Sequence, residues 1–387
     1  MKIVIALLLA LACLLNHPSW AADPPPNRRL REEVMDIASG RGWLAVPLET
    51  TIYRPPGDGP FPLLIMNHGK SPGKPAFQGR NRSVVMATEF VRRGYAVILP
   101  MRKGFSKSGG QYIDGGCNIA GNGEAQADDV QAVLDYARQQ AWVDPSRIIV
   151  MGQSHGGLTT MALGARNPAG VKALLNFAGG LRLDAFTCNW KVSLVDAFAD
   201  YGSRTHIPSL WFYGANDSYF GPDLVERMFA AYTKTGAPAK LVAFGPFKAD
   251  AHGMSGSRDG IPIWWPPTEA LLKEVGMPTE RTVVLTGELP RSDFARLEDV
   301  EALPYRNEKG GALYAKFLQV PLPRAFAISR SGQSGLAWGG DNPSERALQN
   351  CQKNSPEPCA LYAIDEDVVW VVPPGKAVGM AGAATTP

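Results

Sequence analysis

The feature that most constrains the fold is a regular alternation of apolar runs and amphipathic stretches between residues 61 and 245. Apolar runs typical of buried strands lie at 61–69, 95–100, 147–152, 171–180, 208–214 and 239–245. Stretches with helical spacing of apolar residues lie between them, at 82–94, 123–140, 157–168 and 222–236. Strands separated by helices need crossover connections. The pattern therefore predicts the α/β class, with a mostly parallel central sheet and helices on both faces.

The segments on either side of this region complete the predicted organisation. Residues 33–39 and 43–56 are typical of an antiparallel strand pair, and 267–278 of a closing helix. We therefore predict one large domain over 31–278. In 279–374 the alternation is lost and Cys351 and Cys359 are close in sequence, which predicts a small α+β accessory domain held by one disulfide. The tail, 375–387, is of low complexity and is predicted to be disordered.

The first 22 residues have the pattern of a secretory signal peptide. Lys2 precedes a continuous apolar run, which is followed by the small residues Ala21 and Ala22. The run is too short to span a bilayer, so we predict cleavage after one of these alanines and a secreted or periplasmic protein. Lipidation at Cys13 and a retained membrane anchor are the alternatives. The sequence has no other apolar run of spanning length, so no membrane span is expected after cleavage.

The charge and the cysteines constrain the partners and the compartment. Cleavage removes Lys2 and no acidic residue, which lowers the formal net charge from +3 by one. This balance gives no reason to expect a nucleic-acid partner. Four cysteines remain in the mature chain: Cys117, Cys188, Cys351 and Cys359. An even number in an exported protein favours two disulfides, with three connectivities open, and four buried free thiols are the alternative.

Ser154 lies between a predicted strand and a predicted helix, in the sequence GQSHGG (152–157). The motif alone is weak, because the chain contains 41 glycines. Its context is stronger. Gly152 and Gly156 lack a Cβ, so the strand can turn sharply into the helix and expose the serine hydroxyl. The helix N-terminus supplies exposed N–H groups beside developing negative charge. We therefore predict that Ser154 is a nucleophile.

A serine hydroxyl needs an adjacent base, and the chain has five histidines. Four fit that role poorly: His17 in the signal peptide, His206 before a strand at the far end of the sheet, His155 on the turn itself, and His68 at the end of an earlier strand. His252 follows the last strand, at the same end of the sheet as Ser154. We therefore predict that His252 is the base.

The base needs a carboxylate that fixes its tautomer and stabilises the imidazolium. Asp217 follows the strand at 208–214, at the same end of the sheet, and is the predicted partner. Asp250 is the competitor, but it lies only two residues before His252, where a solvated position is expected. Asp217 as a simple turn former is the other alternative, because Asn-Asp is favourable in turns.

The order Ser154, Asp217, His252 resembles that of the α/β-hydrolase superfamily and differs from those of chymotrypsin and subtilisin. Five segments within 31–278 resemble the dienelactone hydrolase-like and prolyl-oligopeptidase-like branch: NHGKSPG, ILPMRKGFSKSGG, GQSHGG, YGANDSYFGP and AHG. The resemblance implies the α/β-hydrolase fold and an oxyanion hole built from the backbone N–H groups of His155 and Lys70. It implies neither a metal nor an organic cofactor.

Three departures limit what the resemblance implies. Dienelactone hydrolase itself uses a cysteine nucleophile, so its lactone substrate is not carried over to a chain with Ser154. No long propeller domain precedes the predicted hydrolase domain, so selection for oligopeptides is not implied. The final hundred residues fall outside the resemblance.

Two connections are expected to shape the pocket. In this fold the connection at 181–208 commonly carries a lid, and the glycine-rich loop at 109–123 lies opposite. Both leave strands at their C-terminal ends, where ligands of open α/β sheets bind. A Cys117–Cys188 disulfide would join them, with Cys351–Cys359 as the second bond. The short lid predicts an open pocket for small acyl groups, with three candidate lining residues: Tyr112, Trp190 and Tyr219.

The sequence thus predicts an exported serine hydrolase that cleaves small or medium acyl esters through an acyl-enzyme. A serine peptidase or aminoacyl amidase on the same three residues is the first alternative. The second is a cell-envelope binding protein in which 279–374 is the working part. The expected partner is a small-molecule ester or amide, and the sequence indicates no oligomeric state.

Overall fold

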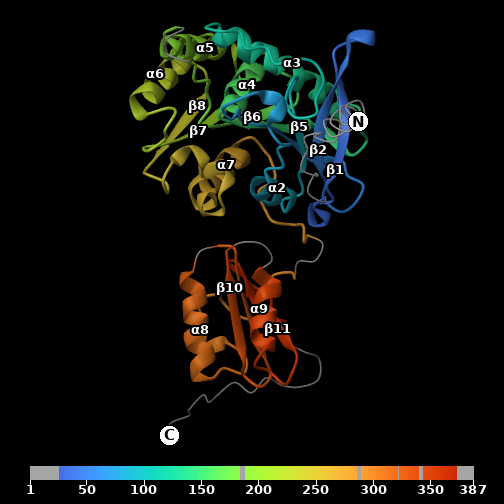
Figure 1. The fold of residues 1–387 in the computed structure, drawn as a ribbon, viewed down its shortest axis with the longest axis vertical. Coiled ribbons are helices and arrows are strands. Elements are labelled where there is room, and N and C mark those ends of the chain that lie inside the picture. Colours follow the sequence, from blue (N-terminus) through green and yellow to red (C-terminus); the bar gives the residue numbers. More distant parts are fainter. Residues whose placement is uncertain (1–25, 184–187, 286–288, 321, 340–342, 373–387) are drawn as a thin grey trace, which may run out of the picture.

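The computed structural model describes residues 26–183, 188–285, 289–320, 322–339 and 343–372. Its larger unit contains an eight-stranded sheet in the order β1-β2-β4-β3-β5-β6-β7-β8 (Figure 1). The strands are β1 (Glu33–Ser39), β2 (Val46–Tyr53), β3 (Phe61–Asn67), β4 (Ala96–Pro100), β5 (Val143–Gln153), β6 (Val171–Phe177), β7 (Ser209–Gly214) and β8 (Ala239–Phe244). β2 is antiparallel to β1 and β4, and the other neighbours are parallel. The predicted α/β class and mostly parallel sheet are confirmed.

Six helices cover this sheet: α2 (Val84–Val91), α3 (Ile119–Arg138), α4 (His155–Gly164), α5 (Trp190–Arg204), α6 (Pro222–Thr233) and α7 (Ile261–Glu274). One apolar cluster joins α3, α4, α5 and α6 to one face of the sheet, and a second joins α2 and α7 to the other. Side chains alternate between the faces along a strand. In β5, Ile148 and Val150 lie in the first cluster, while Ile149 and Met151 lie in the second. The apolar run that predicted this strand is therefore buried on both sides.

Helix α5 corrects the prediction of a lid at 181–208. Its buried residues include Trp190, Leu194, Phe198 and Tyr201, which recur at helical spacing and belong to the core. The helix packs against α3 and α6, so this stretch is a crossover helix. Residues 184–187 of the predicted lid lie outside the described part of the chain.

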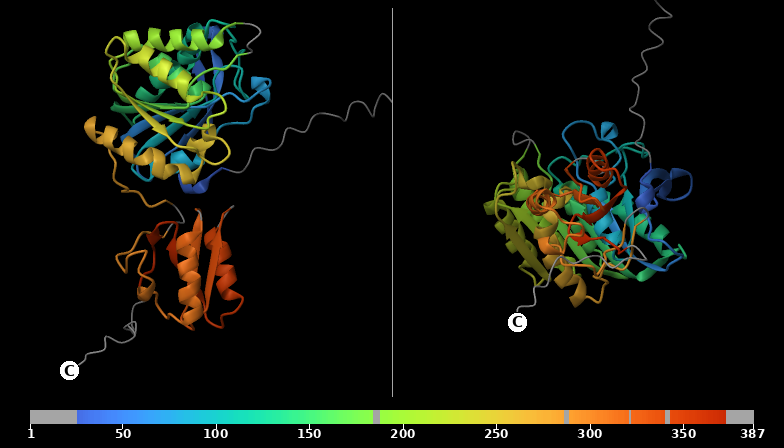
Figure 2. Two further views of the ribbon diagram at one scale, coloured as in Figure 1. Left: turned by 90° about the vertical axis from the view of Figure 1, so that its left-hand side faces the viewer. Right: turned by 90° about the horizontal axis from the view of Figure 1, so that it is seen from below.

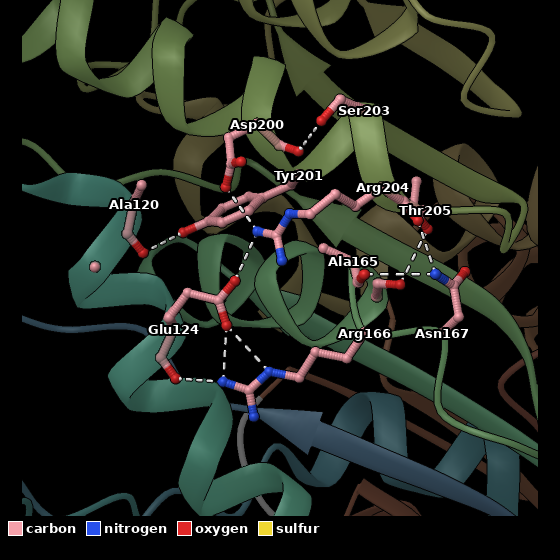
Figure 3. Close-up of polar contacts among 12 residues, drawn as sticks. Ala120, Glu124, Ala165, Arg166, Asn167, Asp200, Tyr201, Ser203, Arg204 and Thr205 are labelled. Carbon is pink, nitrogen blue, oxygen red and sulfur yellow. Dashed lines mark hydrogen bonds and ion pairs between the residues drawn. The ribbon is translucent and has the colours of Figure 1, made fainter.

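A group of ion pairs fastens α5 to its neighbours (Figure 3). The Glu124 carboxylate on α3 accepts from Arg166 and from Arg204, each at 2.7 Å, and Arg204 is the last residue of α5. The Tyr201 hydroxyl also donates to the Ala120 carbonyl at 2.7 Å. These contacts hold the crossover helix against α3.

Two helices begin earlier than the sequence predicted. Helix α3 begins at Ile119, inside the predicted glycine-rich loop, because the Asn118 side chain caps it by accepting from the Gly121 N–H at 2.8 Å. Helix α7 begins at Ile261, before the predicted start at Pro267, and contains both Pro266 and Pro267. Trp264, in the added first turns, is fully buried, so these turns pack an apolar side chain into the core.

A separate antiparallel sheet lies in the C-terminal part, in the order β10-β9-β11-β12 (Figures 1 and 2). Its elements are α8 (Glu308–Gln319), β9 (Arg324–Ser329), β10 (Ser334–Trp338), α9 (Pro343–Gln352), β11 (Cys359–Ile364) and β12 (Asp367–Val368). Phe326 and Ile328 pack in one cluster with α8, whereas Ala325 and Ala327 pack in another with α9. The two helices therefore cover opposite faces of this sheet. This unit fits the predicted α+β accessory domain. The predicted disordered tail lies outside the described residues.

Both predicted disulfides are present. Cys117–Cys188 joins the segment before α3 to the segment before α5, with 5.9 Å between the Cα atoms. Cys351–Cys359 joins α9 to β11. The alternative of four free thiols is therefore wrong. In the described part of the chain no helix is long and apolar enough to cross a membrane.

Ion pairs also connect the two units. Arg258, shortly after His252 in sequence, forms an ion pair with Asp365 at 2.7 Å. Arg281 lies between Glu89 of α2, at 2.9 Å, and Asp367 of β12, at 3.7 Å. The turn between β11 and β12 thus faces the segment that follows His252.

Candidate active site

Ser154 lies at the turn between β5 and α4, as the N-cap of α4. Its backbone has φ 56° and ψ −123°, a conformation that residues other than glycine rarely adopt. Neighbouring segments fix it there: its N–H donates to the Phe177 carbonyl at 2.9 Å, and its carbonyl accepts from the Gly180 N–H at 3.0 Å. Strain of about 1–3 kcal/mol at such a residue persists only where the surroundings enforce it, and it is common at functional sites.

The glycines on either side of Ser154 are sterically required. A Cβ on Gly152 would lie 2.0 Å from the Gly156 carbonyl oxygen. A Cβ on Gly156 would lie 2.0 Å from the Asn67 carbonyl oxygen at the end of β3. Both contacts are with backbone atoms, which cannot move aside easily. The chain can therefore pass from β5 into α4 this tightly only with glycine at both positions.

The imidazole of His252 is paired with the carboxylate of Asp217. His252 lies in the 3₁₀ segment η4 (Ala251–Gly256) after β8, and Asp217 lies in the turn after β7. The His252 Nδ1 lies 3.0 Å and 3.1 Å from the two carboxylate oxygens, so Nδ1–H donates to the carboxylate. The Asp217 side chain is fully buried and also accepts from the backbone N–H groups of Tyr219 and Phe220. This pairing leaves the Nε2 of His252 to act as an acceptor.

Asp250, the competing carboxylate, binds backbone and hydroxyl groups. It accepts from the His252 backbone N–H at 2.9 Å and from the Ser218 hydroxyl at 2.6 Å. It thereby links the loop that carries His252 to the loop that carries Asp217. The structure thus places Asp250 in support of the loops, with no hydrogen bond to the imidazole ring in the described part of the chain.

Ser154 and His252 line one cavity of about 860 Å³. Much of its lining comes from the chain between the end of β3 and the start of α2, which contributes Lys70, Arg80 and Arg82. Among the described residues that line it, none is an aspartate or a glutamate. No hydrogen bond joins the Ser154 hydroxyl to His252 in the described residues; such bonds are often long before a substrate binds.

The three candidate lining residues lie in different places. Tyr219 lines the cavity, and its ring centroid is 4.4 Å from that of His252. Trp190 lies outside the lining, because it is buried in the core beside Phe220. Tyr112 also lies outside it and packs edge-on against the buried ring of His155.

The two backbone N–H groups predicted to form the oxyanion hole, those of His155 and Lys70, make no hydrogen bond within the described residues. Lys70 lines the cavity, and His155 begins α4 directly after Ser154. Both N–H groups therefore remain available to an oxyanion formed at Ser154.

A buried arginine next to this turn, Arg102, is not among the predicted site residues. Arg102, two residues after the end of β4, is fully buried and contacts His68 and His155 through hydrogen bonds. Burial, and then the nearby Arg102 guanidinium, hold the pKa of both imidazoles well below the ordinary value, so both are neutral. The only signal in the sequence is an arginine that lies two residues after a buried strand. No metal site accompanies it: among the described residues no group of three or more His, Cys, Asp or Glu side chains could hold a metal ion.

Comparison with known proteins gives partial matches. The X-Pro dipeptidyl-peptidase (S15) family matches residues 42–185. The chain is 26% identical over 227 residues to "Uncharacterized peptidase YuxL" of Bacillus subtilis (strain 168), which covers 52% of this chain and 32% of that protein. It is 30% identical over 129 residues to the cocaine esterase of Rhodococcus sp. (strain MB1 Bresler), which covers 33% of this chain and 21% of that protein. The chain thus spans about a third or less of the length of these relatives.

A solved structure of a putative dienelactone hydrolase from Klebsiella pneumoniae subsp. pneumoniae MGH 78578 is similar at 21% identity. The match covers 63% of this chain and 99% of that chain, with a TM-score of 0.45. The family match includes β3, β5 and the Ser154 turn. The strand order of the larger sheet and the strand–serine–helix turn at Ser154 are those of the α/β-hydrolase fold, as predicted.

Proposed function

We propose that the chain is an exported serine hydrolase that cleaves carboxylic esters of small or medium acyl groups. One observation carries the proposal: a serine in a strained, glycine-flanked turn shares a cavity with a histidine whose other ring nitrogen is bonded to a buried carboxylate. The catalytic unit is assigned to 31–278, and 279–374 to the accessory domain.

The reaction follows the two-step course of acyl transfer. Ser154 Oγ attacks the ester carbonyl carbon while His252 Nε2 takes its proton, and the oxyanion accepts from the N–H groups of His155 and Lys70. Collapse of this intermediate breaks the C–O bond, and His252 returns the proton to the leaving alcohol. Water then attacks the acyl-enzyme by the same steps and releases the acid. Asp217 keeps the proton on Nδ1 of His252 and stabilises the imidazolium.

A peptidase on the same residues is the second candidate, because one partial relative is named a peptidase and another an esterase. The described part of the cavity favours the ester. A protonated peptide amine is bound best by carboxylates, and none of the lining residues that the structure describes is acidic. The ammonium group of Lys70 in the same lining makes a free amine less favourable still.

Turnover of matched substrates tests this proposal. We expect hydrolysis of p-nitrophenyl acetate and butyrate, with aminoacyl p-nitroanilides turned over at least about 100-fold more slowly. Ser154→Ala is expected to remove catalysis through the acyl-enzyme. At most, hydrolysis would remain about 10³–10⁴-fold faster than the uncatalysed reaction in water. Ser203→Ala, at an exposed serine on α5, is the matched control and should match wild type. Faster turnover of the anilides would make the peptidase the better assignment.

Export is part of the proposal and rests on the signal-peptide pattern and the two disulfides. We expect the mature protein to begin at Ala22 or Asp23. Edman sequencing or intact mass of protein recovered outside the cytoplasm checks this. An intact N-terminus, or a lipid on Cys13, would contradict it.

A further inference from the structure

The guanidinium of Arg102 joins the two backbone segments that carry the proposed oxyanion donors. Its Nη2 donates to the His68 carbonyl at 2.8 Å and to Nδ1 of His155 at 3.1 Å. Its Nε donates to the Gln126 side chain of α3 at 3.0 Å. His68 lies two residues before Lys70, and His155 supplies the other donor. One planar, rigid group thus fixes the spacing of both segments.

The ring of His155 is locked on its other side as well. Its Nδ1 accepts from Arg102, so the proton lies on Nε2, which donates to Oδ1 of Asn122 at 2.7 Å. The amide of Asn122 in turn donates to the carbonyls of Ile113 and Asp114, each at 2.8 Å. The side chain of His155 therefore serves as an anchor for the first turn of α4, away from the cavity.

Arg102 is retained at an energetic cost. It is 0% exposed, it forms no ion pair in the described part of the chain, and its Nη1 is buried without a hydrogen-bond partner. Unsatisfied buried donors of this kind are costly and rare in native proteins. Burial lowers the pKa of Arg102 to about 10, so the group keeps its charge at neutral pH. A buried positive charge that forms no ion pair in the described residues, and that the Asp129 carboxylate stabilises only at longer range, is therefore held beside the Ser154 turn.

We propose that Arg102 is a positioning residue for the oxyanion hole. It holds the N–H groups of Lys70 and His155 at the spacing that the tetrahedral oxyanion requires, and its buried positive charge favours the oxyanion over the neutral ester. This role rests on the proposed function of Ser154.

The test compares Arg102→Met, which keeps the length and loses the donors and the charge, with wild type on a p-nitrophenyl ester and its thiono analogue. Sulfur accepts hydrogen bonds weakly, so the oxo/thiono ratio of kcat reports the oxyanion hole. We expect a kcat on the oxo ester about 10–100-fold lower, with KM within about threefold. The oxo/thiono ratio should fall by a similar factor. Arg102→Lys should recover part of the lost kcat.

Arg93→Met is the matched control. Arg93 is an almost fully buried arginine on the other face of the sheet, bonded to Glu89 and to the Thr279 carbonyl. The Arg93→Met substitution should lower the melting temperature without changing the oxo/thiono ratio.

A folded Arg102→Met protein with the wild-type ratio would overturn the proposal. If that variant does not fold, His155→Leu removes the acceptor of Arg102 but keeps the backbone donor, and the same fall in the ratio is expected. An unchanged oxo/thiono ratio in His155→Leu would also overturn the proposal. Wild-type protein that neither turns over esters nor is labelled at Ser154 would instead defeat the proposed function, and this role with it.

Discussion

At the scale of single residues, the site depends on positions with almost no freedom. Gly156 is in contact with the end of β3, so its lack of a side chain sets the distance between the Ser154 turn and the segment that carries Lys70. Asp217 is bound by two backbone N–H groups, so its carboxylate is already aimed at His252 before any substrate binds. This preorganisation lowers the cost of reaching the transition state.

Gly156→Ala should destabilise the protein and impair the site, because the added Cβ meets a carbonyl at 2.0 Å. Overpacking of this kind costs about 1–3 kcal/mol or more of unfolding free energy. Gly245→Ala is the control, since a Cβ there meets nothing within 4 Å. Urea unfolding of both variants checks this. Equal stabilities would show that the turn is looser than described.

Asp217→Asn should keep the fold and lower kcat by about 10⁴-fold, because an amide cannot hold the His252 proton on Nδ1 or stabilise the imidazolium. Asp223→Asn, at an exposed position in the first turn of α6, should have no effect. Steady-state kinetics on a p-nitrophenyl ester separate the two. A modest loss in Asp217→Asn would transfer the orienting role to another group.

At the scale of elements, the strands deliver every candidate residue at their C-terminal ends. β3 leads to Lys70, β5 to Ser154, β7 to Asp217 and β8 to His252. Parallel strands bring these ends to one edge of the sheet, so four segments far apart in sequence form one site. The helices hold these loops in place, and the Cys117–Cys188 bond ties the α3 and α5 ends together.

Replacing Cys117 and Cys188 by serine should lower the unfolding free energy by roughly 4 kcal/mol, from the loop-closure entropy of a separation of 71 residues. The kcat should remain within about twofold, because neither cysteine lines the cavity. Cys351→Ser with Cys359→Ser, across a separation of 8, should cost less. Denaturant unfolding and ester kinetics on both pairs check the order.

Glu32 ties the segment before β1 to the cavity wall, where it binds Arg80 at 2.9 Å and also Arg82. Burial by itself raises the pKa of Glu32. The hydrogen bonds from Arg82 and Arg80 lower it, and together with the other contacts they outweigh burial, so the pKa lies below its ordinary value. A lowered carboxyl pKa stabilises the fold above the unfolded pKa, and this stability is lost as the pH falls through the folded pKa.

Glu32→Gln should therefore cost about 3 kcal/mol of unfolding free energy at pH 7, and less as the pH falls below about 4.5. Glu33→Gln is the control: its pair with Arg54 is partly exposed, and it should cost at most about 1 kcal/mol. Urea unfolding across this pH range is the measurement. A pH-independent difference would contradict the proposed role of the charge.

At the scale of the whole molecule, the two units meet through charged side chains near the His252 segment. The left view of Figure 2 shows the C-terminal sheet and its helices as a separate unit below the larger one. Partly exposed pairs such as Arg258–Asp365 contribute about 0–1 kcal/mol each and are screened by salt. The contact is therefore expected to be weak and salt-sensitive.

Arg258→Gln with Arg281→Gln should increase the radius of gyration in low-salt X-ray scattering, and high salt should do the same to wild type. Ester kcat should stay within about twofold, since neither arginine lines the cavity. Lys273→Gln, which breaks a surface pair within α7, is the control and should change nothing. A loss of kcat on separation would give the C-terminal unit a role in catalysis.

The sequence predicted the sheet well because buried parallel strands are continuous apolar runs, and each run from 61 to 245 became a strand. The spacing of buried residues in α5 was also present in the sequence, but the expectation of a lid concealed it. Ser154, Asp217 and His252 could be proposed because their distance from strand ends is a local property. The contacts of Arg102 could not, because they join β4, β3, α3 and the Ser154 turn, which only the fold brings together.

The measurement that tests the central claim most directly is labelling of the full mature protein with a fluorophosphonate, followed by peptide mapping. We predict one modified site, Ser154, with labelling that is lost in Ser154→Ala and strongly slowed in His252→Ala. Labelling of another residue, or none in protein shown to be folded with both disulfides formed, would contradict the assignment of Ser154 as a nucleophile activated by His252.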